Sequence, residues 1–88
     1  MVKDYRSKPK IYADILEAVA EKGYSRPTQI MTDANLSYDR LRKHLETLVE
    51  KGLLKNEDDT YLITEKGIKF LDEFKRFERF AAAFGLRI

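Results

Sequence analysis

Two short helical patterns joined by a three-residue turn, with a hairpin pattern directly after them, restrict the fold of this chain more than any other feature. Residues 26–33 and 38–51 carry apolar side chains at helical spacing, and residues 34–36 form a tight turn between them. Residues 53–56 and 60–63 predict two short strands around an Asn-Glu-Asp-Asp turn. A generic three-helix bundle would share the two helices, but it would lack a hairpin at this place.

Two longer helices flank this unit. The first is predicted over residues 8–22 with Ser7 as its N-terminal cap, and the last over residues 65 to about 84 with Thr64 as its cap. The resulting order is helix, helix–turn–helix, hairpin and long helix, which is the layout of a winged helix–turn–helix. We therefore expect a mainly α protein with one small β-hairpin, an α+β fold.

The apolar periodicity also predicts the core. In the second half of the helix–turn–helix, one face of the helix carries four aliphatic residues, and the turn before it points one leucine inward. His44 lies at the edge of this face, where a half-buried structural histidine is expected. The side chains predicted to be buried in this region are Ile30, Met31, Leu36, Leu41, Leu45, Leu48 and Val49.

Composition excludes several classes of protein. With 88 residues the chain fits one small domain, and 43% hydrophobic with 36% charged residues excludes a disordered chain and a membrane span. No cysteine is present, so disulfides and thiolate metal sites are excluded, and the single histidine excludes a paired-histidine metal site. We find no Gly-rich phosphate loop and no nucleophile–base pair, so no enzyme and no cofactor is expected. The basic first ten residues lack an apolar leader, which indicates a cytoplasmic protein.

Three stretches of the sequence resemble a known family. They are Ala-Asn-Leu-Ser-Tyr at residues 34–38, Glu-Lys-Gly-Leu-Leu at 50–54, and Tyr-Leu-Ile-Thr-Glu-Lys-Gly at 61–67. Over about residues 11–74 the chain is similar to the small archaeal winged helix–turn–helix proteins, which include crenarchaeal chromatin proteins that dimerise through a C-terminal antiparallel coiled coil. This resemblance implies DNA binding, with the third helix in the major groove and the wing beside the backbone.

Basic side chains gather at the N-terminus and in the third helix. Residues 1–10 hold four basic side chains and one acidic side chain, and residues 37–55 hold five basic and three acidic side chains. A recognition helix reads DNA with residues near its own N-terminus, although the same charges also suit an ordinary solvated helix face. The candidates for DNA contact in the third helix are Ser37, Tyr38, Arg40, Arg42 and Lys43.

Two further segments carry possible DNA contacts. Arg26, Thr28 and Gln29 open the second helix, whose N–H groups favour a phosphate; alternatively, Ser25 and Thr28 only cap that helix. The first ten residues form either a basic arm along the DNA or a disordered terminus. The wing tip at residues 57–59 holds three consecutive acids, which repel phosphates, so we expect it to make no favourable contact with DNA.

All five phenylalanines lie in the last helix. Heptad spacing there indicates a dimer interface, with Ile68 and Leu71 on the opposite face and docked on the chain's own domain. Alternatively, the helix folds back over the first helix and buries the aromatic rings within one chain. The residues of the predicted dimer interface are Phe70, Phe74, Phe77, Ala81 and Phe84.

These patterns divide the chain into a basic N-terminal arm over residues 1–10, a DNA-binding domain over 11–64, and a dimerisation helix over 65–88. We expect a homodimer that binds double-stranded DNA as a transcription regulator or a small chromatin-type protein, with no membrane partner. The competing interpretation is a winged-helix module that binds another protein and no DNA, because this fold serves both purposes.

Overall fold

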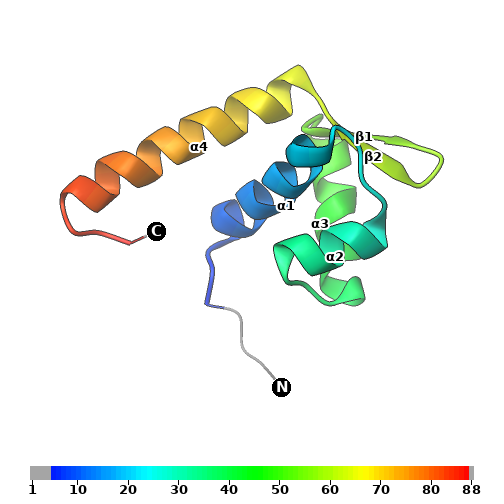
Figure 1. Ribbon diagram of the computed structural model, residues 1–88, viewed down its shortest axis with the longest axis horizontal. Coiled ribbons are helices and arrows are strands. Elements are labelled where there is room, and N and C mark those ends of the chain that lie inside the picture. Colours follow the sequence, from blue (N-terminus) through cyan, green and yellow to red (C-terminus); the bar gives the residue numbers. More distant parts are fainter. Residues whose placement is uncertain (1–4, 88) are drawn as a thin grey trace.

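The computed structural model describes residues 5–87, and within them it contains four helices and one antiparallel hairpin (Figure 1). This confirms the predicted mainly α fold with a small hairpin. No helix in residues 5–87 is long and apolar enough to cross a membrane. The elements are α1 (Lys8–Lys22), α2 (Pro27–Ala34), α3 (Tyr38–Glu50), β1 (Leu54–Glu57), β2 (Thr60–Ile63) and α4 (Glu65–Ala83).

Three hydroxyl caps start three of the helices, as predicted. The side chain of Ser7 accepts a hydrogen bond from the amide of Lys10, and that of Ser37 accepts one from Arg40. Thr64 accepts from the amide of Gly67 at the start of α4. Each cap satisfies a backbone donor that has no acceptor earlier in its helix.

The turn between α2 and α3 also has the predicted form. Asn35 adopts a left-handed conformation with φ of 54°, which lets the amide of Leu36 reach back to the carbonyl of Met31 at 3.0 Å. Leu36 is only 7% exposed, so it points into the core as expected. This turn fixes the angle at which α3 leaves α2.

The hairpin begins one residue later than predicted. The amide of Leu53 closes the end of α3 by donating to the carbonyl of Leu48 at 2.9 Å, so β1 starts at Leu54. The strands pair in register from Leu54 opposite Ile63 to Glu57 opposite Thr60. A two-residue turn at Asp58 and Asp59, both with positive φ, connects them.

A third segment extends this small sheet by one residue. Ser25, between α1 and α2, forms an antiparallel bridge to Tyr61, with N···O distances of 2.9 and 2.8 Å for the two reciprocal hydrogen bonds. Arg26, which precedes Pro27, has the extended backbone conformation that a following proline favours. The bridge ties the start of α2 to the wing.

One hydrophobic core joins α1, α2, α3 and the hairpin. Of the predicted core residues, Ile30, Leu36, Leu41, Leu45 and Leu48 are buried. Met31 and Val49 are partly buried and pack against the edge of the core. The largest fully buried side chains are Ile15, Leu16, Val19, Ile30, Leu41, Leu48 and Leu54.

The orientation of α4 differs from the prediction. Leu71 is buried at 7% exposure as expected, but Ile68 is 46% exposed and does not dock on the domain. Phe74 and Ala81 are buried instead, because they lie three and ten residues after Leu71 and therefore share its face of the helix. Phe70 is partly buried and packs against the same core.

The predicted aromatic stripe is therefore divided. Phe70 and Phe74 pack on the domain, while Phe77, Phe80 and Phe84 are between 54% and 67% exposed. Two ion pairs accompany the contact between α4 and α1: Lys75 with Glu17, and Lys10 with Glu78. Figure 1 shows that the second half of α4 extends away from the remainder of the molecule.

Candidate nucleic-acid interface

The N-terminal half of α3 presents polar side chains to solvent while its other face is buried. Tyr38 is 50% exposed, and Arg42 and Lys43 are exposed. Arg40 is only partly exposed. Ser37 is exposed at the cap, where its oxygen accepts a hydrogen bond and its hydroxyl proton remains a donor. Four of the five predicted residues of α3 thus lie on an open surface.

The two exposed cations of this surface differ in their surroundings. Arg42 lies 3.7 Å from Glu46 in an ion pair whose side chains are 68% and 72% exposed. Such exposed pairs contribute little free energy and exchange readily with another anion. Within residues 5–87, the ammonium group of Lys43 forms no ion pair, and its backbone carbonyl accepts from the hydroxyl of Thr47.

The start of α2 lies beside this surface. Arg26, Thr28 and Gln29 are all exposed, as a DNA contact requires. Arg26 occupies the N-cap position, but no side chain caps the helix, so the idea that Ser25 or Thr28 is its cap is wrong. The backbone N–H and C=O of Ser25 both bond to Tyr61 of the hairpin, and the residue is only 3% exposed.

A cleft of about 390 Å³ connects α2, α3 and the hairpin. Pro27 contributes from α2, Tyr38 and Arg42 from α3, and Asn56 and Tyr61 from the two strands. The cleft brings Pro27, at the start of α2, together with Tyr38 and Arg42 of α3 on one side of the molecule. It is also lined by Leu41, Leu45, Glu46 and Asp59.

Two residues of this surface, Asn56 and Tyr61, were not predicted from the sequence. They lie opposite one another in the hairpin register, and the amide of Asn56 donates to the phenol oxygen of Tyr61 at 3.4 Å. Burial, followed by the nearby negative charge of Asp59, raises the pKa of the Tyr61 phenol. The phenol of Tyr61 is protonated at neutral pH, so its hydroxyl is a potential hydrogen-bond donor. The sequence signal for this role was a tyrosine in a predicted wing strand.

The wing tip carries the expected negative charge. Glu57, Asp58 and Asp59 are all exposed. Lys55 lies 3.0 Å from Glu57 and compensates part of this charge. The backbone of Asp59 is held by a hydrogen bond from its amide to the side-chain oxygen of Asn56 at 3.1 Å.

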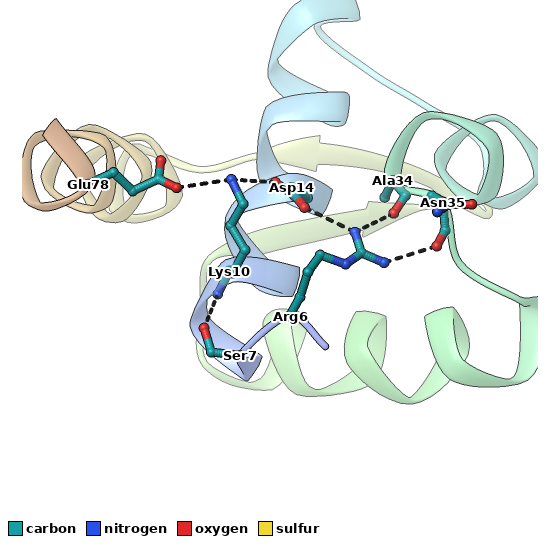
Figure 2. A network of polar contacts seen from close by, with 7 residues as sticks. All are labelled: Arg6, Ser7, Lys10, Asp14, Ala34, Asn35 and Glu78. Carbon is teal, nitrogen blue, oxygen red and sulfur yellow. Dashed lines mark hydrogen bonds and ion pairs between the residues drawn. The ribbon is translucent and has the colours of Figure 1, made fainter. Parts of the chain in front are cut away.

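Two basic residues of the predicted N-terminal arm are engaged inside the molecule (Figure 2). Arg6 donates to Asp14 at 3.0 Å and to the carbonyls of Ala34 and Asn35 at 2.7 and 3.0 Å. A cation at these carbonyls stabilises the C-terminal end of α2. Residues 1–4 of the predicted arm lie outside the described residues, and α1 already begins at Lys8.

Lys10 connects this network to α4. Its ammonium group lies 3.0 Å from Glu78 and 3.3 Å from Asp14 (Figure 2). The hydrogen bond that Lys10 donates to the carboxylate of Glu78 is the main reason that the pKa of Lys10 is raised above its ordinary value. Arg6 and Lys10 therefore do not form a free basic arm.

His44 has the structural surroundings that were expected. It is partly buried, and its ring meets that of Tyr12 edge-on with a centroid distance of 5.4 Å. Among residues 5–87, no three histidine or carboxylate side chains come together in a way that could hold a metal ion.

Comparison with known proteins places this geometry in a family. A family model described as winged helix-turn-helix matches residues 5–82. The chain is similar to Sso10a-2, a DNA-binding protein from Sulfolobus solfataricus, with 29% identity and a TM-score of 0.79 over 90% of this chain and 85% of that one. Its fold is also similar to that of BpsR from Bordetella bronchiseptica, whose DNA binding is regulated by 6-hydroxynicotinic acid.

The match to BpsR covers 76% of this chain and 52% of that protein, with 18% identity and a TM-score of 0.68, so it supports the fold alone. No curated protein sequence matches the chain. The family expected from the sequence is nevertheless confirmed, because the family model covers nearly the whole domain together with most of α4. The chain belongs to the winged helix–turn–helix family.

Proposed function

We propose that this protein binds double-stranded DNA as a transcription regulator or a small chromatin-type protein, with α3 in the major groove. The observation that carries the proposal is the open surface at the start of α3, where Tyr38, Arg42 and Lys43 are exposed beside the exposed start of α2. The family and the similarity to Sso10a-2, a DNA-binding protein, support it independently.

Each group in this surface has a chemical role that suits DNA. The guanidinium of Arg42 and the ammonium of Lys43 can donate to guanine edges or neutralise phosphates. Tyr38 and Ser37 have hydroxyl groups that can donate to phosphate oxygens at the mouth of the groove. Arg40 is less exposed and would contact the adjoining DNA backbone. Arg26, Thr28 and Gln29 would contact the DNA backbone from α2. None of these roles requires a cofactor.

The acidic wing restricts how the duplex can approach. Three carboxylates at residues 57–59 would repel phosphates, so the wing tip points away from the backbone while α3 occupies the groove. The same acids would suit a basic protein partner, which is the observation that favours the competing interpretation. In that case the exposed face of α3 would make no contact with DNA.

We further propose that the protein is a homodimer through α4. The exposed rings of Phe77, Phe80 and Phe84 form an apolar strip on one side of the end of α4, and Leu86, in the segment after the helix, is 62% exposed. Large exposed apolar patches mark interfaces. Phe70 and Phe74 pack against the core and anchor the first half of α4 on the domain, and Ala81 is buried near the end of the helix. Two copies would present two α3 helices to successive major grooves, about 34 Å apart.

A titration of the native chain with random and genomic duplex fragments at several salt concentrations tests the proposal. Phosphate contacts release counterions, so the logarithm of the association constant falls with the logarithm of the salt concentration, by about 0.9 for each phosphate neutralised. We expect a steep slope. Binding that does not depend on salt, or no binding at about 50 mM salt, would favour the protein-partner interpretation.

A further inference from the structure

A second hollow in the surface lies where the chain enters α2. It has a volume of about 340 Å³, and every side chain in its lining has a hydrogen-bond donor, two of them cationic and none a carboxylate. The chain holds 15 acidic residues, and both the cleft beside α3 and a third hollow, next to α1, are lined in part by carboxylates. The lining of this pocket therefore suits an anion. Its residues are Lys22, Tyr24, Ser25, Arg26, Thr28 and Gln29.

Ser25 gives this pocket an unpaired buried donor. The residue is 3% exposed, and its side-chain oxygen has no hydrogen-bond partner among residues 5–87. Its backbone N–H and C=O are both used in the bridge to Tyr61, which fixes the residue in place. Buried hydroxyls in proteins nearly always have a partner, and a ligand bound in the hollow would supply the acceptor that this one lacks.

The backbone at the same place favours negative charge. α2 starts without a side-chain cap and without an acidic residue in its first turn. The amide of Thr28 lies in that first turn and has no acceptor earlier in the helix, and the partial positive charge of the helix end faces the pocket. Arg26, at the N-cap, adds a full positive charge. Lys22 forms an ion pair with Asp33 at 3.1 Å. Arg26 is therefore the principal cation of the pocket.

We propose that this pocket binds a single phosphate group, with the hydroxyl of Ser25, the amide of Thr28 and the guanidinium of Arg26 as its donors. The position indicates the DNA backbone as the source of that phosphate. Pro27, which separates Arg26 from Thr28, also lines the cleft shared with Tyr38, so the pocket adjoins the surface proposed to meet DNA. That identification of the source rests on the proposed function, whereas binding of a free phosphate does not.

The first experiment uses inorganic phosphate and the full chain without DNA. Amide resonances are followed by nuclear magnetic resonance during a titration at constant ionic strength, with chloride as the competing ion. We expect the resonances of Ser25 and Thr28 to shift together, and Ser25→Ala to weaken phosphate binding about ten-fold, as for loss of a hydrogen bond to a charged group. Thr32→Ala removes a hydroxyl from the same helix outside the pocket and should leave the affinity unchanged.

A melting curve of each variant separates binding from folding. Because Ser25→Ala removes an unpaired buried hydroxyl, its melting temperature should be equal to or above that of the native chain while phosphate binding falls. Arg26→Gln changes an exposed side chain and provides a second variant that weakens phosphate binding. Unshifted resonances at Thr28, or equal phosphate affinity for the native chain and Ser25→Ala, would overturn the proposal.

The second experiment repeats the duplex titration with Ser25→Ala. If the DNA backbone occupies the pocket, the variant should bind duplex more weakly at every sequence, and the salt slope of Arg26→Gln should decrease by about one phosphate. Unchanged duplex affinity in both variants would overturn the DNA source and leave the pocket to a free phosphorylated ligand. If the native chain binds phosphate but no duplex, the phosphate site stands and the proposed DNA function fails.

Discussion

Replacement of Gly67 by alanine tests the junction between the hairpin and α4. Gly67 is buried in the first turn of α4, where an added methyl group would collide with the carbonyl oxygen of Leu53 and approach Cγ1 of Ile63 to 2.8 Å. Neither neighbour can move freely. The Leu53 carbonyl accepts a hydrogen bond from the amide of Thr64 at 3.2 Å, and the hydroxyl of Thr64 donates to the carbonyl of Gly52 at 2.6 Å.

Two effects of opposite sign decide the outcome of Gly67→Ala. Helix propensity alone would stabilise the variant by about 1 kcal/mol, because alanine loses less backbone entropy than glycine. Overpacking a well-packed junction costs about 1–3 kcal/mol, and displacing the Leu53 carbonyl from Thr64 costs about 1 kcal/mol more. The close approach therefore wins, and we expect the free energy of unfolding to fall by about 1–3 kcal/mol. For a domain of this size, a loss of about 2 kcal/mol lowers the melting temperature by about 8–16 °C.

Thermal unfolding followed by far-ultraviolet circular dichroism measures this effect. Lys69→Ala is the matched control, because Lys69 is exposed in the same helix and its replacement should change the free energy of unfolding by no more than about 0.5 kcal/mol. A melting temperature of Gly67→Ala at or above that of the native chain would refute the reasoning. It would mean that α4 leaves the hairpin at a different angle from the one described.

Three further predictions concern binding and assembly. Arg42→Ala should weaken duplex binding by about 1–3 kcal/mol in a fluorescence titration and leave the melting temperature unchanged, whereas Arg76→Ala, an equally exposed arginine in α4, should affect neither. Neutralising the acids at residues 57–59 should leave duplex affinity unchanged or raise it; a loss would show that the wing is misplaced on DNA. The pair Phe77→Glu and Phe84→Glu should elute as a monomer with weaker duplex binding, since an unpaired buried charge costs several kcal/mol. If light scattering of the native chain at about 100 µM gives the monomer mass, the dimer proposal is wrong.

Local rules predicted the starts of α1, α3 and α4 because the interactions that set them span only three residues. The hydroxyls of Ser7, Ser37 and Thr64 each meet an amide three positions later, so the sequence around each one contains both partners. The turn at Asn35 was predictable for the same reason. The open surface of α3 followed from its apolar spacing, which left the polar residues on the other side.

Contacts between distant residues left no comparable signal. The bridge between Ser25 and Tyr61 is a single pair, 36 positions apart, and one residue has no periodicity from which a strand could be predicted. The contacts of Arg6 with the carbonyls of Ala34 and Asn35 span 28 and 29 positions and use backbone atoms that every residue has. A short basic segment was therefore interpreted as an arm, although Arg6 in fact stabilises the end of α2.

The rotation of α4 about its own axis was also not predictable from the local sequence, and it matters for the proposed function. Heptad spacing identified a row of aromatic residues but not the rotation of the helix about its own axis, which the close approach at Gly67 helps to set. That rotation buries Phe74 against the domain and exposes Phe77, three positions later. In the proposed dimer, the distance between the two α3 helices is consequently fixed by how each α4 sits on its own α1. The ion pair between Lys10 and Glu78 lies in that contact, so it links the basic N-terminal segment to the spacing of the proposed DNA-binding helices.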